Sequence, residues 1–292
     1  MTEVTSTVSK HAKVVAVAGA LLGAAATFSA HGIAFNPNRI VDGNPESLLS
    51  GLGAWGWVLL AMWIGAAALS VSPLPERVRG ITVTLHGGAA PVLMLWASGA
   101  AAQAWVSETS DVARTSLLWA AWLSLFASYV VIFAATAWLE AGALRALLTY
   151  APVISAAVLI GTGQLDELAV MREYANNAED FAVEFRLHLL YVAGAVSIGL
   201  VAGVALGLLA ARRRTLEPAI FGTLNVLQVF PTLAFIGLMY PVLSGLSARF
   251  AFFDALNVRG VGWAPVIIVL SAYAVYPIAR NTYTSLINLD AG

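Results

Sequence analysis

Eight long stretches without a charged residue constrain this chain more than any other feature of its sequence. Each holds at least 20 residues, mostly Ala, Leu, Val, Ile, Gly and aromatic residues, with His counted as neutral. A helix of about 20 apolar residues crosses the roughly 30 Å hydrocarbon core of a bilayer and satisfies its own backbone there. Barrel strands would show alternating segments of about 10 residues, a pattern absent here. The sequence therefore predicts an all-α integral membrane protein with about eight transmembrane helices, within residues 14–38, 47–75, 80–107, 115–139, 146–165, 187–211, 218–248 and 260–279.

The composition and the missing motifs exclude several functions. Only 11% of the residues are charged, against about 25% in soluble domains. There is no cysteine, so disulfides and thiolate chemistry are excluded. The chain has no GxxxxGK[ST], HExxH or GxSxG motif, and its four histidines lie in different segments. We expect a transport subunit and not an enzyme, with no cofactor, no metal site and no nucleic-acid partner.

Charge distribution predicts the orientation. With the N-terminus in the cytoplasm, nine of the 15 Lys and Arg residues and five of the 16 acids fall on the cytoplasmic side. This arrangement obeys the positive-inside rule, and the run Ala-Arg-Arg-Arg at 211–214 is its strongest anchor. Residues 1–30 could instead be a cleaved signal peptide, because Phe28-Ser29-Ala30 resembles a cleavage site. Cleavage would leave the orientation of the other seven spans unchanged.

Three regions follow one another along the chain. Residues 1–163 hold five spans joined by short loops and form an accessory N-terminal region. Residues 164–187 are polar and acidic, with apolar residues at helical spacing, and predict an amphipathic segment on the outer side. This segment is either a solvated surface or a docking surface for an external partner. Residues 188–292 hold three more spans.

Two patterns in the last region concern helix packing and transport. Gly199, Gly203 and Gly207 repeat every four residues, which places them on one helix face and lets another helix approach closely. Asn225 and Gln228 precede Pro231 by one to two turns, which predicts a bent helix facing the bundle interior. The two amides either line a transport route or bond to a neighbouring helix.

The predicted spans contain no Asp, Glu, Lys or Arg, so the chain lacks the intramembrane relays of proton-coupled pumps. A transport subunit that takes its energy from another chain fits this absence better than a proton-coupled pump. We therefore expect ATP hydrolysis, if it drives transport, on a separate subunit.

Residues 184–289 resemble a known family. They include Glu184-Phe-Arg-Leu-His188, then Leu224-Asn-Val-Leu-Gln-Val-Phe-Pro-Thr-Leu-Ala234, and finally Ala274-Val-Tyr-Pro-Ile-Ala-Arg-Asn-Thr-Tyr283. In order and spacing they resemble the permease subunits of ABC importers for glycine betaine, choline and related osmoprotectants. The five extra spans ahead of this core resemble the longer variant of that family.

The resemblance implies a type I ABC importer core in a multi-pass protein of the bacterial plasma membrane. It implies uptake of quaternary-ammonium osmoprotectants under osmotic stress, dependent on an external solute-binding protein. Two permease subunits, identical or different, would form the pathway in the bilayer, and cytoplasmic ABC ATPase subunits would hydrolyse ATP. Carried over by position, the residues nearest the route are Asn225, Gln228, Pro231 and Thr232.

The family continues past Asp290 into a cytoplasmic Glu-Ala-Ala loop that docks on the ATPase, followed by further spans. The resemblance thus implies a C-terminally incomplete core of three spans, from a fragment or a truncated gene, that cannot by itself couple ATP hydrolysis to uptake.

Two other functions remain open on the sequence alone. The chain could be the permease of an ABC importer for another small solute, such as an amino acid. It could also be a non-transporting membrane scaffold that lacks the coupling loop.

Overall fold

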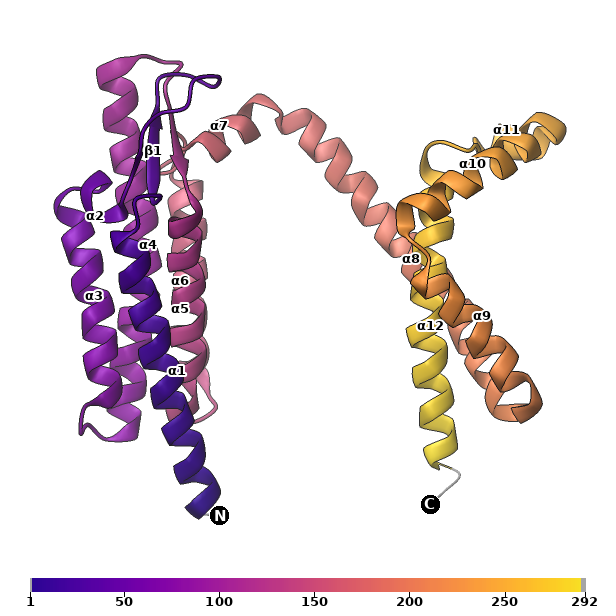
Figure 1. Ribbon diagram of the computed structural model, residues 1–292, viewed down its shortest axis with the longest axis horizontal. Helices are drawn as coiled ribbons and strands as arrows, with labels where there is room; N and C mark the ends of the chain where they lie inside the picture. Colours follow the sequence, from indigo (N-terminus) through magenta and orange to yellow (C-terminus); the bar gives the residue numbers. More distant parts are fainter. Residues whose placement is uncertain (1, 290–292) are drawn as a thin grey trace. The chain divides into compact units, whose positions relative to one another are not determined.

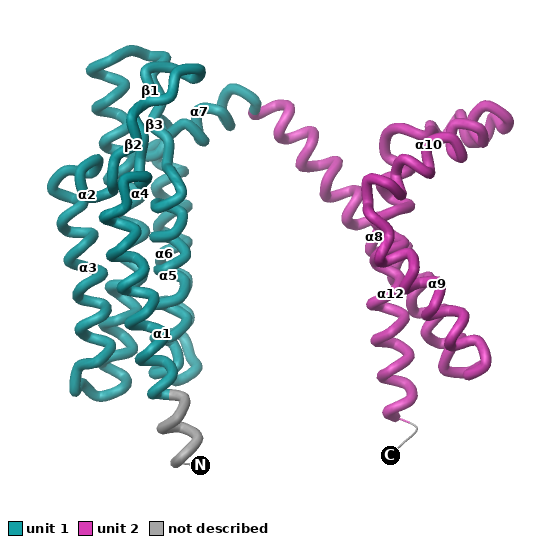
Figure 2. The backbone as a smooth tube through the Cα atoms, in the orientation of Figure 1, with its two compact units in different colours: residues 1–177 teal, residues 178–292 magenta. Residues whose placement is uncertain are grey.

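The computed structural model describes residues 2–289, with side chains from residue 9 onward. Residues 290–292, just ahead of the expected coupling loop, lie outside the described residues. The chain divides into two compact units, residues 1–177 and 178–292 (Figure 2). The division falls inside the polar segment 164–187, which therefore contributes to both units. The boundaries at 163 and 188 stay a prediction.

Eight helices of the described chain are long and apolar enough to cross a membrane, as the sequence predicted. Five belong to the first unit, one in each of the first five predicted spans (Figure 1). Their bounds are α1 Thr2–Phe28, α3 Ala54–Val71, α4 Glu76–Thr109, α5 Trp119–Ala135 and α6 Ala143–Gly161. A short 3-10 turn, η1 (Thr136–Trp138), follows α5.

Small residues hold the first unit together. Ala16 and Ala20 of α1 are fully buried, and Gly23 of the same helix lies against the indole of the fully buried Trp63 of α3. Apolar side chains gain nothing by leaving lipid for the interior of a bundle, so helices in a membrane are held by close packing. Helix α1 is thus an integral part of this unit's core.

The helices α1, α4 and α5 share one end of the unit. The Ser9 hydroxyl donates to Glu76 Oε1 at 2.5 Å and accepts from the Trp138 indole N–H at 3.2 Å. This end carries Arg79 and Arg145 and is the one that the charge distribution assigns to the cytoplasm.

The opposite end of the first unit carries a small sheet that the sequence analysis did not predict. Its strands are β1 Ile33–Asn36, β2 Pro45–Glu46 and β3 Arg114–Leu117, in the order β2-β1-β3 and antiparallel. Ile33 pairs with Leu117, and Asn36 with Arg114. Two short helices, α2 (Leu48–Gly51) and α7 (Ala169–Asn176), complete this cap.

Polar contacts tie the cap across long sequence distances. The Asn36 amide donates to Ser116 Oγ at 2.9 Å, and Arg172 donates to the Ala113 carbonyl at 2.8 Å. The exposed Arg39 and the half-buried Glu173 form an ion pair at 2.9 Å. The first part of the polar segment 164–187 is thereby fixed to the loops between α1 and α2 and between α4 and α5.

The described part of the second unit contains three long helices and three short elements. The long ones are α8 (Ala178–Arg212), α10 (Thr232–Arg249) and α12 (Trp263–Leu289). Between them lie η2 (Arg214–Leu216), α9 (Glu217–Val229) and α11 (Ala251–Ala255). Helix α8 has 35 residues. At 1.5 Å per residue it is about 52 Å long and exceeds the hydrocarbon core.

Helices α8 and α12 run parallel and touch through the three glycines. A Cβ atom at Gly199 would lie 2.5 Å from Ala274 Cβ, and one at Gly203 would lie 2.8 Å from Ile278 Cβ. At Gly207 the distance to the Ala279 carbonyl oxygen would be 2.6 Å. All three glycines are buried. Their spacing of four matches the turns of α12, so the two backbones pack without intervening side chains.

We predict opposite effects for alanine at two helical glycines. Gly207→Ala forces α12 away from α8, and overpacking of this kind costs about 1–3 kcal/mol. A Cβ atom at Gly237 of α10 would have no described atom within 4 Å outside its own helix backbone. Gly237→Ala therefore stabilises the helix by up to about 1 kcal/mol. Thermal unfolding of the purified chain measures both. Equal melting temperatures for the two variants contradict the close α8–α12 contact.

Candidate functional site

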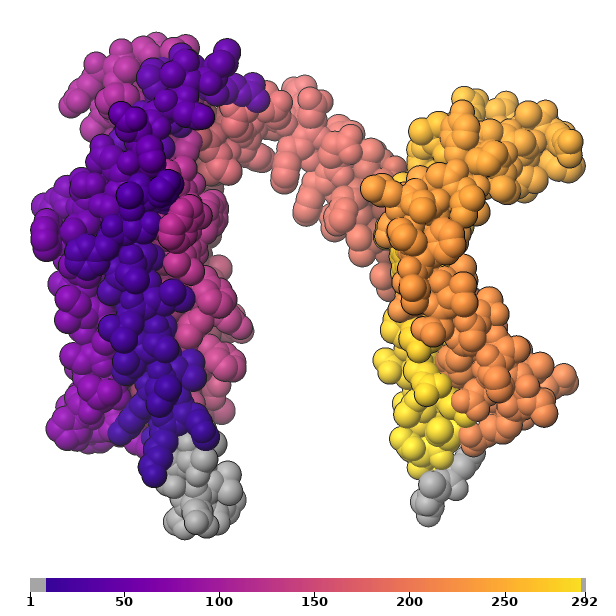
Figure 3. All heavy atoms as spheres, viewed as in Figure 1, coloured from indigo at the N-terminus to yellow at the C-terminus, as the bar shows by residue number. Residues whose placement is uncertain are grey.

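The seventh predicted span, residues 218–248, is broken in two. Phe230 and Pro231 both have extended backbone, with ψ near 129° and 128°, and separate α9 from α10. Proline has no N–H and forces the preceding residue out of the helical region. The sequence predicted a bent but continuous helix at Pro231. The helix is instead interrupted, because Phe230 and Pro231 both leave the helical conformation. Helix α10 turns away from α9 at this point (Figure 1), and the space-filling view shows the same divergence (Figure 3).

Tyr273 of α12 binds the broken segment at three points. Its hydroxyl donates to the Phe230 carbonyl and accepts from Thr232 Oγ1 at 3.3 Å. Its own backbone carbonyl accepts from Gln228 Nε2 at 2.8 Å. One residue therefore holds the end of α9, the break itself and the start of α10.

The bond from Gln228 has a specific cause in α12. A helical proline leaves the carbonyl four residues earlier without its usual donor, and Pro277 does this to Tyr273. The Gln228 amide supplies the missing donor. Pro231 frees no carbonyl in this way, because the Phe230 N–H donates to Leu227 O at 3.4 Å. The sequence analysis associated Gln228 with Pro231. The carbonyl that Gln228 bonds is instead the one left without a donor by Pro277.

The four residues predicted near the route do not all converge. Gln228, Pro231 and Thr232 gather around Tyr273, whereas Asn225 lies nearly a turn earlier on α9. Asn225 is exposed, and its side-chain amide forms no hydrogen bond with any other residue from 9 to 289. It is a free amide on a helix that the sequence predicts to lie in the membrane.

A second contact, missed by the sequence analysis, fastens the other end of α9. The Arg280 guanidinium lies 4.9 Å from the centre of the Phe221 ring and 3.9 Å from Glu217 Oε1. Arg214 donates to the Tyr283 hydroxyl at 2.9 Å. Cation–π contacts of this sort contribute about 0.5–2 kcal/mol. The spacing of Arg280 and Tyr283, three residues apart on one helix face, was the available signal.

The two helices on either side of the break are held very differently. Helix α9 is bound to α12 at both of its ends. Within the described residues, Leu243 is the one buried residue of α10. The site is therefore a fixed short helix, a polar break and an open long helix.

We predict that the Tyr273 hydroxyl limits the mobility of α10. Tyr273→Phe removes two hydrogen bonds at the break, each contributing about 0.5–1.5 kcal/mol, and leaves the ring in place. The sum of about 1–3 kcal/mol predicts that hydrogen exchange of the amides from 235 to 239 becomes roughly five- to hundredfold faster.

Tyr276→Phe is the matched control. Tyr276 lies one turn after Tyr273 and packs edge-on against Phe221, and its hydroxyl forms no hydrogen bond to another described residue. Equal exchange rates in the two variants would show that Tyr273 does not restrain α10.

Comparison with known proteins gives a family match and several curated relatives. Residues 11–171 match the family model described as the N-terminal domain of the ABC transporter permease YehY. The osmoprotectant import permease protein OsmW of Salmonella typhimurium is 33% identical over 105 residues, which are 36% of this chain and 44% of the relative. The choline transport system permease protein OpuBD of Bacillus subtilis is 33% identical over 121 residues, 41% of this chain and 46% of the relative.

The glycine betaine/carnitine/choline transport system permease protein OpuCD of Bacillus subtilis is 32% identical over 117 residues, 40% of this chain and 44% of the relative. The chain thus spans less than half the length of these curated relatives. No solved structure matches it significantly.

Proposed function

The chain belongs to the family of ABC transporter permeases that share the YehY N-terminal domain, and we propose that it is the membrane-spanning subunit of an ATP-driven importer for quaternary-ammonium osmoprotectants. Glycine betaine, choline and proline betaine are the solutes we have in mind. The names of three relatives support this class over amino acids. Two name choline and two name glycine betaine or osmoprotectants, and glycine betaine and choline both carry a trimethylammonium group.

The observation that carries the proposal is the polar break between α9 and α10. Irregular backbone at membrane depth is tolerated only where protein buries it or where it lines a water-filled cavity. Broken helices of this kind form the substrate sites of many transporters. The free amide of Asn225, the break at Pro231 and the hydroxyl of Thr232 therefore suit a pathway through the bilayer.

The open face of α10 supports an assembly of two permease subunits. A helix that buries one residue in its own chain has its remaining surface available for lipid or for a partner. A second permease subunit, identical or different, would cover the broken segment and close the pathway. The backbone groups at the break would then face the interior of the assembly.

The other partners that we propose are cytoplasmic ATPase subunits and an external solute-binding protein. The sequence of this chain contains no phosphate-binding loop, so cytoplasmic ABC ATPase subunits would supply the energy. An external solute-binding protein would deliver the substrate, held in an aromatic cage by cation–π attraction. The assembly would lie in the bacterial plasma membrane.

Uptake of labelled glycine betaine at high osmolarity tests this function. The host lacks its own betaine importers and expresses the complete locus with or without this subunit. We expect uptake to need both the subunit and an intact ATPase. No uptake with a properly inserted subunit would refute the proposed substrate class.

Two substitutions test the site in the same assay. Asn225→Leu removes a free amide and leaves every contact of α9 to α12 intact, so we expect normal insertion and at least fivefold slower uptake. Gln228→Leu leaves the Tyr273 carbonyl without a donor in lipid and should slow uptake and lower stability together. Val226→Leu, an exposed apolar neighbour on α9, is the control. Parental rates in both amide variants would remove these residues from the pathway.

A further inference from the structure

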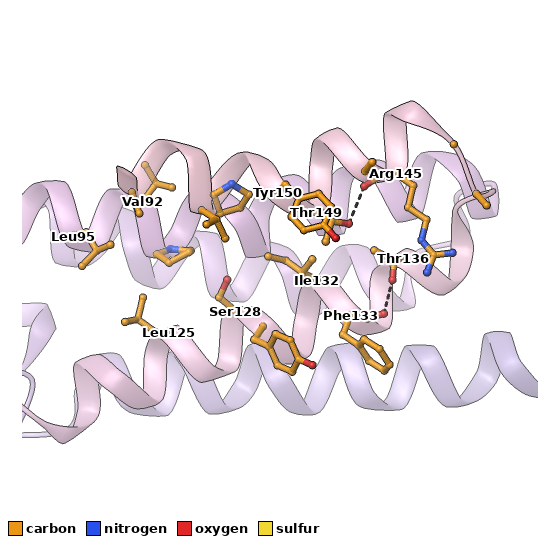
Figure 4. A pocket seen from close by; sticks show the side chains of 18 residues that line it. Val92, Leu95, Leu125, Ser128, Ile132, Phe133, Thr136, Arg145, Thr149 and Tyr150 are labelled. Carbon is orange, nitrogen blue, oxygen red and sulfur yellow. Dashed lines mark hydrogen bonds between the residues drawn. The ribbon is translucent and has the colours of Figure 1, made fainter. Parts of the chain in front are cut away.

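A groove between α5 and α6 of the first unit has no role in the proposed pathway. Its volume is about 780 Å³, and it is lined by residues of α4, α5 and α6 (Figure 4). No residue of α6 is buried in the described structure. The helix rests on α4 where Pro152 meets Gly88, and this contact leaves the side toward α5 open. The volume lies within the range of ordinary ligand sites, about 300–1,000 Å³.

The lining of the groove changes from apolar to polar along its length. Val92, Leu95 and Leu125 line one end, and Arg145, Thr136 and Thr149 line the other (Figure 4). The two threonine hydroxyls donate to backbone carbonyls of their own helical turns and are already satisfied. Arg145 is the one charged residue among the described residues that line the groove.

Arg145 is a half-buried cation without an anion. It forms no ion pair with any carboxylate in the part of the chain whose side chains are described. Glu76, on the same end of the unit, accepts from Ser9, and Glu140 is exposed to solvent. A cation that is partly removed from water and has no counter-charge favours an anionic ligand.

Arg145 also lies where the apolar groove meets a second hollow. This hollow has a volume of about 460 Å³ and is lined by Arg77, Trp138 and Glu140 among others. The ligand that fills both spaces has an apolar chain and an anionic head. An apolar helix from a partner would fill the groove but leave Arg145 unpaired, and a free anion would leave the groove empty.

The length of the groove matches one leaflet of a bilayer. From Arg145 to Ala156 it follows α6 for twelve residues, a rise of about 16 Å. Half of the hydrocarbon core is about 15 Å. An acyl chain entering at Arg145 therefore ends near the middle of the membrane.

We propose that this groove binds an acyl chain of an anionic phospholipid from the leaflet that faces the cytoplasm, with the lipid phosphate on Arg145. The cytoplasmic leaflet carries anionic lipids, and basic pockets between transmembrane helices bind their headgroups. The proposal does not depend on which solute the assembly transports.

Native mass spectrometry of the full chain in detergent, with phosphatidylglycerol or phosphatidylcholine added, tests this site. We expect one phosphatidylglycerol to be retained in preference to phosphatidylcholine. Arg145→Gln should weaken its binding about fivefold, as expected for one basic residue at a membrane surface. Ala156→Phe fills the groove and should abolish retention while leaving the charge in place.

Each variant has a matched control outside the groove. Lys10→Gln removes an exposed cation at the same end of the unit, and Ala157→Phe adds a ring to the exposed neighbour of Ala156. Both should retain phosphatidylglycerol within twofold of the parent chain.

Equal binding of the two lipids, or parental binding in Arg145→Gln, would overturn the proposal. Loss of a dimer in Ala156→Phe with unchanged lipid binding would assign the groove to a second copy and would also overturn it. Should Ala156→Phe fail to fold, the lipid preference and its loss in Arg145→Gln decide the matter alone.

Discussion

A carbonyl that loses its helical donor inside a bilayer has no water to bond with, and Pro277 creates such a carbonyl at Tyr273. A side-chain amide from another helix can replace the missing donor. Gln228 Nε2 does so, at 2.8 Å from the Tyr273 carbonyl oxygen. That bond fixes the end of α9 against α12. The side chain of the same residue, Tyr273, then donates its hydroxyl to the carbonyl of Phe230 at the break. Two prolines in different helices are thus accommodated by one set of contacts.

This arrangement separates a rigid part of the second unit from an open part. The glycines of α8 allow it to lie directly on α12, and the contacts of Arg280 and Tyr273 fasten both ends of α9 to the same helix. Helix α10 begins at the break and buries almost nothing in its own chain. A transporter that alternates between two states needs such a division, with a fixed frame beside a segment that is free to repack. The account of function therefore rests on the break and not on any single polar side chain.

Much of this architecture could be predicted from the sequence, because the governing constraint is local. A bilayer demands about 20 apolar residues per crossing, so the charge-free stretches identified the eight spanning helices. The glycine spacing likewise placed three close contacts on one face of α8, although their partners on α12 lie about 75 residues away and were not identifiable. The family resemblance was drawn from residues 184–289, and the family model matches residues 11–171.

What the sequence did not reveal depends on pairs of residues far apart in the chain. Strands β1 and β3 have four residues each and pair across about 80 positions, so neither has a pattern of its own. The partner of Gln228 depends on a proline 49 residues later, and the partner of Phe221 is Arg280. The groove beside α6 arises because α6 packs mainly on α4 and buries none of its described residues. Hydropathy cannot distinguish such a helix from a fully buried one.

The central claim is that the break between α9 and α10 faces an aqueous pathway, and thiol labelling in cells tests it most directly. The chain has no cysteine, so single cysteines can be introduced at Asn225, Thr232 and, as a lipid-facing control, the exposed Leu21 of α1. Cells expressing the complete locus are treated with a membrane-impermeant maleimide. The account predicts labelling at 225 and 232 and none at 21. Labelling at neither 225 nor 232, in a subunit that inserts normally, would contradict it.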